Sequence, residues 1–561
     1  MPHRQNPAEL PSNAEIMVAS NAMVGVSGSD LLGSLRQIAF HGLRQPLHTL
    51  KHLGQLGKSL GHVVLGDSAI APNKTDLRFN DPTWQFNPLY RRTMQSYLAV
   101  QQQLHSWLKE SDLPGEDKAR ALFVMGLLTD AASPSNALIN PQAVKELFDT
   151  AGYSVVKGLR NLFDDWLHNG GLPSQVSKHA FEVGKNLATC EGAVVYRSDM
   201  FELIQYKPLT EQVYAKPLLI VPPQINKFYI FDLSPEKSFV RYCLKHGLQT
   251  FIISWRNPDA RHREWGLSSY AEAVQQAMQV MQQICGSKDV HLLGACAGGM
   301  NIALLQGHLA AKRKLKQVAS ATYLVSLLDC QIDSQMTLFA NEETIETAKR
   351  RSYQQGVLDG RDMARVFAWL RPNDLIWNYW VNNYLLGKEP PAFDVLYWNN
   401  DNTRLPATLH GDLLDCFKHN PLARANAIEV CGTPIDLKKV TVDSMTIGGM
   451  TDHITPWDAV YRSANLLGGD SRFILSSSGH VQSILNPPEK RSKRYFYQSG
   501  ALSSDPRAWL YDAKRQEGSW WPTWLNWMQE RSGEKQEAVP ALGNQSHPVL
   551  GDAPGIFVHV R

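Results

Sequence analysis

The sequence predicts an α/β fold with a mostly parallel, doubly wound sheet, and three observations support this expectation. Strand patterns alternate with helical patterns from about residue 193 to 327 and again from 444 to 475. The alternation stops between these two stretches, and the residues before 193 show helical patterns only. Because strand and helix alternate in parallel sheets with helical crossovers, we expect such a sheet with an inserted cap subdomain, preceded by a helical domain.

The helical N-terminal domain is expected over residues 1–185. Apolar residues recur at helical spacing in segments such as 31–39, 46–60 and 90–108, separated by loops rich in Pro, Asn and Asp. The length of 561 residues exceeds what one ordinary core accommodates. A separate helical domain is therefore consistent with the chain length.

The sheet domain is expected over residues 186–535, with the cap at about 329–442. Its clearest helix covers 270–285 and carries a possible capping box from Ser269 to Glu272. Residues 536–561 are rich in Gly, Pro, Glu and Gln, so we expect a C-terminal tail there. The strand candidates are a hairpin pair at 193–196 and 201–206, followed by 217–221, 250–254, 290–293, 321–327, 444–448 and 472–475.

Composition excludes several classes of function. The net charge of +3, from 56 basic and 53 acidic residues, gives no support for nucleic-acid binding. Seven scattered cysteines without a C-x-x-C or Cys/His spacing argue against a zinc site and for a reducing compartment. Without a signal-peptide pattern or a run of about 18 apolar residues, we expect a cytoplasmic protein with no transmembrane segment.

Residues Gly294-Ala295-Cys296-Ala297-Gly298 place a cysteine where an α/β-hydrolase carries its nucleophilic serine. A short apolar strand pattern precedes the segment and an apolar helix follows it, which is the context that this turn requires. The flanking glycines permit a strained turn and close packing of helix on strand. We therefore expect an α/β-hydrolase fold with Cys296 as nucleophile, the alternative being a buried structural cysteine.

A cysteine nucleophile needs a base and an acid that orients it, and in this fold they follow in the order acid, histidine. Asp452 follows the strand at 444–448, and His480 follows the strand at 472–475 through a flexible loop. Asp329, just after the strand at 321–327, is the rival acid. His453 is the rival base, although beside Asp452 we expect it to support the loop or to contact substrate.

The oxyanion hole of this fold uses the amide after the nucleophile, here Ala297, and a second amide from the loop after an earlier strand. That loop begins with two prolines, which have no N–H to donate. The second donor therefore comes from Gln224, Ile225 or Asn226, and we favour Ile225. A rigid loop without a catalytic role is the alternative.

The choice of cysteine over serine indicates acyl transfer. Thiolate attack on a thioester gives another thioester, so the acyl group stays activated for transfer to a hydroxyl. Water then has to be excluded, and a cap rich in tryptophan, with Trp377, Trp380 and Trp398, suits that purpose. An ordinary helical insertion with an aromatic core is the alternative.

Several segments, taken in order, resemble the class II, medium-chain-length polyhydroxyalkanoate synthases, and within them the second-synthase type. The resemblance covers essentially the whole chain. One local difference is Ala297, where many relatives have Ser, although an amide donor survives either way. The segments that carry the resemblance are the Cys296 turn at 294–299, Pro222-Pro223-Gln224-Ile225-Asn226-Lys227-Phe228-Tyr229, Ile253-Ser254-Trp255-Arg256-Asn257-Pro258, residues 371–380, Tyr397-Trp398-Asn399, residues 452–457 and Ser478-Gly479-His480.

The resemblance implies that (R)-3-hydroxyacyl-CoA thioesters of medium chain length are polymerised into a polyester. Cys296 would carry the growing chain, His480 would activate the thiol and then the 3-hydroxyl, and Asp452 would orient His480. Coenzyme A thioester is then the substrate, and no cofactor or metal is expected. A homodimer, granule association through the helical domain and granule-coat proteins as partners are further implications.

The resemblance also implies roles in substrate binding. Arg371 matches a position near the CoA channel, with a salt bridge in the cap as the alternative. Trp398 lies in a segment at the cap and dimer contact. Ser326 and Gln482 flank the expected pocket and would help to set the preferred side-chain length.

Two other functions remain open on the residues alone. A cysteine hydrolase of the dienelactone or thioesterase kind would release a soluble acid. A non-catalytic granule-associated protein would carry a vestigial elbow, which the ordered Cys296, Asp452 and His480 argue against.

Overall fold

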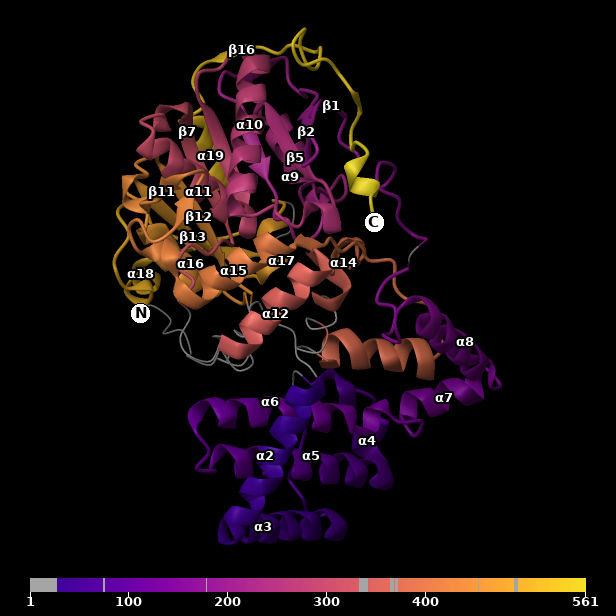
Figure 1. The fold of residues 1–561 in the computed structure, drawn as a ribbon. Coiled ribbons are helices and arrows are strands. Elements are labelled where there is room, and N and C mark those ends of the chain that lie inside the picture. Colours follow the sequence, from indigo (N-terminus) through magenta and orange to yellow (C-terminus); the bar gives the residue numbers. More distant parts are fainter. Residues whose placement is uncertain are drawn as a thin grey trace.

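The computed structural model describes residues 28–73, 76–177, 179–331, 342–363, 368, 372–452, 454–488 and 493–561. Figure 1 shows a bundle of N-terminal helices at one end of the molecule and a sheet covered by helices at the other. Helices of the inserted region lie between these two parts. The predicted order of helical domain, sheet and insertion is therefore found.

The sheet has 11 strands in the order β15-β14-β13-β12-β7-β6-β4-β5-β2-β1-β17. Neighbours from β5 through β4, β6, β7 and β12 to β13 are parallel, and the outer neighbours are antiparallel. A doubly wound parallel centre is thereby confirmed. The strands are β1 (Gly192–Arg197), β2 (Phe201–Tyr206), β4 (Leu218–Val221), β5 (Thr250–Trp255), β6 (Val290–Ala295), β7 (Val318–Leu324), β12 (Ser444–Gly449), β13 (Ser471–Ser476), β14 (Arg494–Tyr497), β15 (Lys514–Glu517) and β17 (Gly551–Asp552).

Two of the local predictions need correction. The strand predicted at 321–327 ends at Leu324, because Val325 has a φ of 44° and leaves the extended conformation. The helix predicted from residue 270 begins at Leu267, and Ser269 is not its N-cap. The Ser269 hydroxyl instead accepts the N–H of Gly266 at 3.4 Å, so the Ser269–Glu272 capping box is absent.

Helices cover both faces of the sheet. One core cluster contains apolar residues of α10 (Leu267–Cys285), α11 (Ala297–Ala311) and α16 (Trp457–Asn465). The other contains residues of α9 (Phe239–Lys245) and α19 (Trp521–Gln529), including the fully buried Trp524. Burial of large apolar side chains on both faces stabilises the parallel strands and fixes their carboxyl ends at one edge.

The N-terminal domain is helical throughout its described residues, and the first strand of the described chain is β1. Asn87 caps α5 by accepting the N–H of Leu89 at 3.0 Å, which satisfies a free donor of the first turn. The elements are α2 (Gly28–Arg44), α3 (Pro46–Leu65), η3 (Leu77–Phe79), α4 (Thr83–Phe86), α5 (Pro88–Lys109), α6 (Gly115–Ala131), η4 (Pro134–Asn136), α7 (Pro141–Asp149) and α8 (Tyr153–His168).

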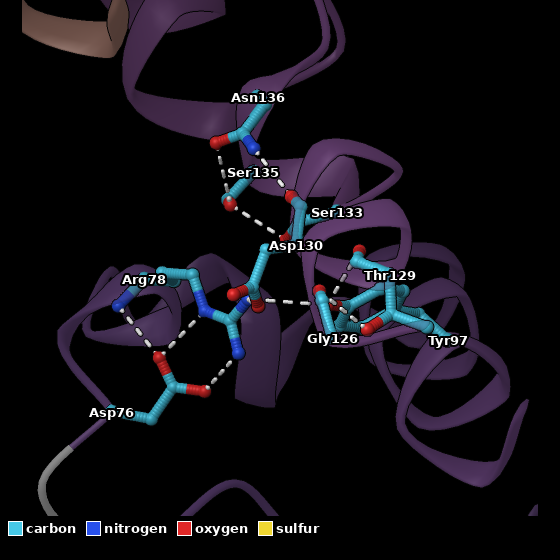
Figure 2. A network of polar contacts seen from close by, with 9 residues as sticks. All are labelled: Asp76, Arg78, Tyr97, Gly126, Thr129, Asp130, Ser133, Ser135 and Asn136. Carbon is cyan, nitrogen blue, oxygen red and sulfur yellow. Dashed lines mark hydrogen bonds and ion pairs between the residues drawn. The ribbon is translucent and has the colours of Figure 1, made fainter. Parts of the chain in front are cut away.

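A partly buried arginine, Arg78, joins η3, α5 and α6 in this domain (Figure 2). Arg78 Nη2 lies 2.9 Å from Asp76 Oδ2, and Arg78 Nη1 lies 3.0 Å from Asp130 Oδ1. Nη1 also donates to the Tyr97 hydroxyl at 3.1 Å, and that hydroxyl donates to the Thr129 carbonyl at 3.0 Å. Burial raises the pKa of Asp130, although hydrogen bonds from Asn373 and Arg78 oppose the shift.

The inserted region contacts the N-terminal domain through α8. The Tyr384 hydroxyl donates to Asp165 Oδ2 at 2.8 Å, and Asn161 Nδ2 donates to the Asn383 carbonyl at 3.0 Å. A Cβ on Gly158 would lie 1.9 Å from the Tyr384 carbonyl oxygen, so this glycine permits the close approach. The inserted elements are α12 (Glu342–Gln355), β8 (Val357–Leu358), the π-helical η9 (Asn373–Trp377) and η10 (Trp380–Leu385), α14 (Asp394–Asn400), β9 (Leu405–Pro406), α15 (Ala407–His419), η11 (Pro421–Ala423), β10 (Glu429–Val430), β11 (Thr433–Pro434) and η12 (Leu437–Lys439).

Residues 536–561, expected as a tail, run back along the sheet domain. The strand β16 (Lys535–Glu537) pairs with β3 (Gln212–Tyr214), and β17 pairs with β1. The buried Glu202 carboxylate accepts the N–H groups of Ile556 at 3.0 Å and Phe557 at 2.9 Å, at the start of η13 (Phe557–His559). A polar composition did not prevent docking, because backbone groups supply most of these contacts.

Within the described residues, no single helix combines the length and the apolar character that crossing a membrane needs. One bent pair, Asp117–Ala131 with Pro134–Asp149, meets the test of length and composition when its members are taken together, with a bend of 44°.

Candidate active site

Cys296 occupies the sharp turn between β6 and α11. Its backbone has φ 51° and ψ −121°, a conformation that non-glycine residues rarely adopt. The Cys296 N–H donates to the Leu324 carbonyl of β7 at 2.9 Å, and its carbonyl accepts the Gly299 N–H at 3.0 Å. These bonds hold the strained turn in place, as the predicted nucleophile elbow requires.

Three glycines around Cys296 permit the close packing of this turn. A Cβ on Gly298 would lie 2.2 Å from the Val221 carbonyl oxygen, and one on Gly294 would lie 2.6 Å from the Gly298 carbonyl oxygen. A Cβ on Gly299 would lie 2.1 Å from Ser326 Oγ. Real Cβ atoms do not approach so closely, so larger side chains at these positions would displace the helix from the strands.

Asp452 and His480 come together beside the elbow. Asp452 follows β12, and His480 begins α17 (His480–Ile484) after β13. His480 Nδ1 lies 2.7 Å from Asp452 Oδ2, and the side chains are 11% and 0% exposed. The Cys296 thiol lies close enough to the imidazole to contribute to the raised pKa of His480. The structure therefore brings together the three residues predicted as nucleophile, base and acid.

The protonation equilibria of the pair are strongly shifted. Burial lowers the pKa of His480, but the charge of Asp452 and the hydrogen bond to it, with a further contribution from Cys296, raise it to about 10 from 6.5. Burial alone would raise the pKa of Asp452, yet His480 and hydrogen bonds from Thr455 lower it. An ionised aspartate beside a histidine that holds its proton is the form that this environment favours.

Thr455 is a site residue that the sequence interpretation missed. Its backbone N–H donates to Asp452 Oδ1 at 2.9 Å and its hydroxyl donates to Asp452 Oδ2 at 2.7 Å. The Thr455 oxygen also lies 3.2 Å from His480 Nδ1. An aspartate followed three residues later by a threonine is a turn pattern that pointed to this arrangement.

The rival acid lies elsewhere. Asp329 Oδ2 forms an ion pair with Arg462 Nε at 3.0 Å, and Asp329 Oδ1 accepts from Asn420 Nδ2 at 2.9 Å. Its carboxylate is thus committed to the contact between α16 and the inserted region. His453, the rival base, lies outside the described residues, as does Arg371.

The two predicted oxyanion donors lie at the elbow and on the facing loop. Ala297 is the first residue of α11, so its N–H is one of the free donors at the N-terminus of that helix. On the loop after β4, Asn226 N donates to Thr403 Oγ1 at 2.9 Å and is unavailable to substrate. This commitment leaves the Gln224 and Ile225 amides as candidate donors, and the preference for Ile225 stays a prediction.

Three further predicted residues have defined positions. Ser326 is buried behind the elbow, and its hydroxyl donates to the Leu324 carbonyl at 2.9 Å. Gln482 lies exposed on α17, two residues after His480. Trp398 of α14 is 6% exposed, and its indole N–H donates to the Lys227 carbonyl at 2.7 Å. Within one chain Trp398 thus packs against the oxyanion loop, and its expected contact with substrate or a second chain stays a prediction.

All seven cysteines are free thiols, and the six other than Cys296 lie outside the turn between β6 and α11. Burial raises the pKa of Cys285 to about 12, which makes that thiol unreactive. Among the residues that the structure describes, no group of three His, Cys, Asp or Glu side chains could hold a metal ion.

The doubly wound sheet, the strained elbow and the ordered Cys, Asp and His define a protein of the α/β-hydrolase class with a cysteine at the nucleophile position. Residues 217–487 match the family model described as the alpha/beta hydrolase fold. Residues 75–243 match the model described as the N-terminus of poly-beta-hydroxybutyrate polymerase (PhaC).

Similarity to named proteins extends over nearly the whole chain. Poly(3-hydroxyalkanoate) polymerase 2 of Ectopseudomonas oleovorans is 61% identical over 98% of this chain and 98% of its own length. Polymerase 1 of the same organism is 55% identical over 99% and 100%. The polymerase subunit PhaC of Cupriavidus necator is 38% identical over 87% and 83%. The chain belongs to the poly(3-hydroxyalkanoate) polymerase family.

Proposed function

We propose that this chain polymerises (R)-3-hydroxyacyl-CoA thioesters of medium chain length into a polyester and releases CoA. The observation that carries the proposal is the His480–Asp452 pair, with 2.7 Å between Nδ1 and Oδ2, together with the strained turn that holds Cys296 between β6 and α11. The names of the relatives support the polymerase activity. The medium chain length follows from the resemblance to class II synthases.

The chemistry proceeds in two acyl transfers. His480 takes the proton of the Cys296 thiol, and the sulfur attacks the thioester carbonyl. A new thioester forms as the bond to the CoA sulfur breaks, and CoA leaves with the proton that His480 held. His480 then takes the proton of a 3-hydroxyl, whose oxygen attacks an acyl thioester and forms the ester bond as the thiolate leaves. Ala297 and Ile225 amides stabilise the oxyanion in both steps. The CoA thioester is the substrate, and the reaction needs neither cofactor nor metal.

We assign the binding of substrate to the residues that the resemblance to class II synthases implies. Arg371 provides a cation for the CoA phosphates, and His453 contacts substrate or supports its loop. Ser326, through its packing under the elbow, and Gln482, on the exposed side of α17, shape the pocket for the acyl side chain. Trp398 acts from the cap.

Association with polyester granules in the cytoplasm, and dimerisation, are assigned to the N-terminal domain and the cap. The N-terminal helices expose many large apolar side chains, which marks a surface that associates with another apolar surface. Granule-coat proteins are further partners in this proposal. The exposed side chains include Leu47, Leu50, Leu53, Val64 and Leu65 on α3, and Tyr153, Val156, Leu159, Phe163, Trp166 and Leu167 on α8.

The decisive experiment compares wild type, Cys296→Ala and the matched control Cys285→Ala with (R)-3-hydroxydecanoyl-CoA as substrate. We expect release of free thiol and an insoluble polyester with wild type and Cys285→Ala, and neither with Cys296→Ala. Thiol release with only soluble 3-hydroxy acid would make the protein a thioesterase and overturn the polymerase. Absence of thiol release from wild type would support a non-catalytic granule protein.

A further inference from the structure

The loop that carries the second oxyanion donor is held by one segment of the inserted region. The loop covers residues 222–227, between β4 and η5 (Phe228–Phe231), and the holding segment covers residues 398–403 at the end of α14 and beyond. Most polar backbone groups of the loop that form hydrogen bonds have their partners in this segment. The contacts thus cross more than 170 positions of sequence.

Thr403 makes the central contact. Its hydroxyl donates to the Gln224 carbonyl at 2.7 Å and accepts the Asn226 N–H at 2.9 Å. The residue is 6% exposed, so water cannot readily replace the hydroxyl. These two bonds are made on either side of Ile225, which leaves the Ile225 N–H as the uncommitted donor between two fixed neighbours.

The flanking residues of the loop are held in the same way. Asn226 adopts a φ of 66°, and its Nδ2 donates to the Trp398 carbonyl at 3.2 Å. The Lys227 carbonyl accepts the Trp398 indole N–H. The Lys227 Nζ lies 3.0 Å from Asp401 Oδ1 and 2.5 Å from the Val558 carbonyl oxygen. A buried lysine with these partners fixes the end of the loop, because moving it would leave its charge without compensation.

We propose that Thr403 is a positioning residue, which sets the Ile225 N–H at the place where the thioester oxygen becomes negatively charged. The proposal rests on the proposed function, since it deepens the acyl transfer at Cys296. Thr403 does not touch the reacting atoms. It acts through the loop, by fixing the peptide groups before and after Ile225.

The proposal separates two reactions of the same cysteine. Acylation by a thioester passes through a tetrahedral oxyanion and needs the amide donors. Alkylation by iodoacetamide is a displacement at a carbon that bears no developing oxyanion, so it depends on the thiol and His480 only. A displaced Ile225 amide slows the first reaction and spares the second.

The test uses the full-length protein and decanoyl-CoA, a thioester without the 3-hydroxyl, so that acylation stops at Cys296. The variants are Thr403→Val, which loses both hydrogen bonds at similar volume, and Thr403→Ser, which retains the hydroxyl. Thr433→Val is the matched control, because Thr433 is 5% exposed and its hydroxyl contacts only the Cys431 carbonyl, at 3.4 Å. Acyl-enzyme is quantified by intact mass after acid quenching, and alkylation is followed in parallel.

We expect acylation of Thr403→Val to slow by about 10- to 100-fold. This effect is no larger than that of removing one oxyanion-hole donor completely, because the Ile225 N–H is displaced but still present. Alkylation should stay within about twofold of wild type, and Thr403→Ser should recover acylation to within about threefold. Thr433→Val should acylate as wild type does. If Thr403→Val does not fold, Thr403→Ala removes the same hydroxyl, and the same outcomes apply to it.

Two results would overturn the positioning role. Acylation of Thr403→Val at the wild-type rate would show that the loop does not need the hydroxyl. An equal slowing of acylation and alkylation would show a general displacement of the elbow. A wild-type protein that is alkylated but never acylated would refute the proposed function itself, and with it the role of Thr403.

Discussion

His480 Nδ1 lies 2.7 Å from Asp452 Oδ2, between two side chains that are almost fully buried. Because an ionised carboxylate only accepts, Nδ1 is the donor and Nε2 is left for the Cys296 thiol. The bond thus sets the direction of the ring, and it fixes the tautomer whenever the ring is neutral. In the proposed reaction, Asp452 therefore acts by orienting His480 and does not touch substrate.

The first prediction concerns Asp452. Replacement by asparagine preserves the shape but presents an amide to Nδ1, so the wrong tautomer is favoured and we expect kcat to fall by about 10³- to 10⁴-fold. The measurement is CoA release at saturating substrate. Asp329→Asn is the matched control, since Asp329 pairs with Arg462 and not with His480, and it should retain kcat to within about threefold.

The second prediction concerns stability against pH. The pKa of His480 is raised to about 10, so its contribution to the free energy of unfolding is complete below the ordinary value of 6.5 and declines up to about pH 10. The difference in unfolding free energy between wild type and His480→Gln should therefore shrink from pH 7.5 to pH 9.5. Urea unfolding at both pH values measures it.

His291 supplies the control for this pH dependence. Burial lowers the pKa of His291 to about 3. The contribution of His291 to the free energy of unfolding therefore changes with pH only below the ordinary pKa of 6.5. The stability difference between wild type and His291→Gln should be the same at pH 7.5 and pH 9.5. If the stability difference between wild type and His480→Gln is also the same at pH 7.5 and pH 9.5, that result would contradict the ion pair between His480 and Asp452.

The third prediction concerns the elbow glycines. An added Cβ at Gly298 would lie 2.2 Å from the Val221 carbonyl oxygen, so Gly298→Ala should destabilise the protein by about 1–3 kcal/mol and displace Cys296. Thermal unfolding and acylation with decanoyl-CoA measure the two effects. Gly57→Ala on α3 is the contrast, because nothing lies within 4 Å there, and it should stabilise by about 0.5–1 kcal/mol.

The fourth prediction concerns Arg78, the partly buried arginine of Figure 2. Arg78→Met would leave the partly buried carboxylates of Asp76 and Asp130 without their cation, and we expect a loss of about 1–3 kcal/mol in the stability of the N-terminal domain. Limited proteolysis of that domain and urea unfolding measure it. Arg515→Met, which removes an exposed pair with Glu517, should leave both unchanged.

The parts of the fold that the sequence predicted are those with strong periodicity. Parallel strands buried on both faces, such as Leu218–Val221, are nearly continuous apolar runs, and the helix that ends at Cys285 has a clear apolar stripe. The three residues assigned to catalysis could be found because the elbow and the chain order constrain them strongly.

Other features had no local signal. The strand Lys514–Glu517 is exposed at all its positions, so it lacks the alternation of a half-buried strand and forms by pairing with Arg494–Tyr497. Thr403 is an unremarkable threonine in sequence, and only the approach of residues 398–403 to the loop gives it a role. Long-range contacts of this kind depend on the tertiary structure.

The separation in sequence of the groups around the oxyanion loop has a consequence for folding. Gln224 and Thr403 are 179 positions apart, and Lys227 and Val558 are 331 apart. Contacts between such distant segments form slowly. Closing the long loop between them costs chain entropy before the contacts themselves contribute any stability. During refolding, helical content should therefore return earlier than the ability of Cys296 to become acylated.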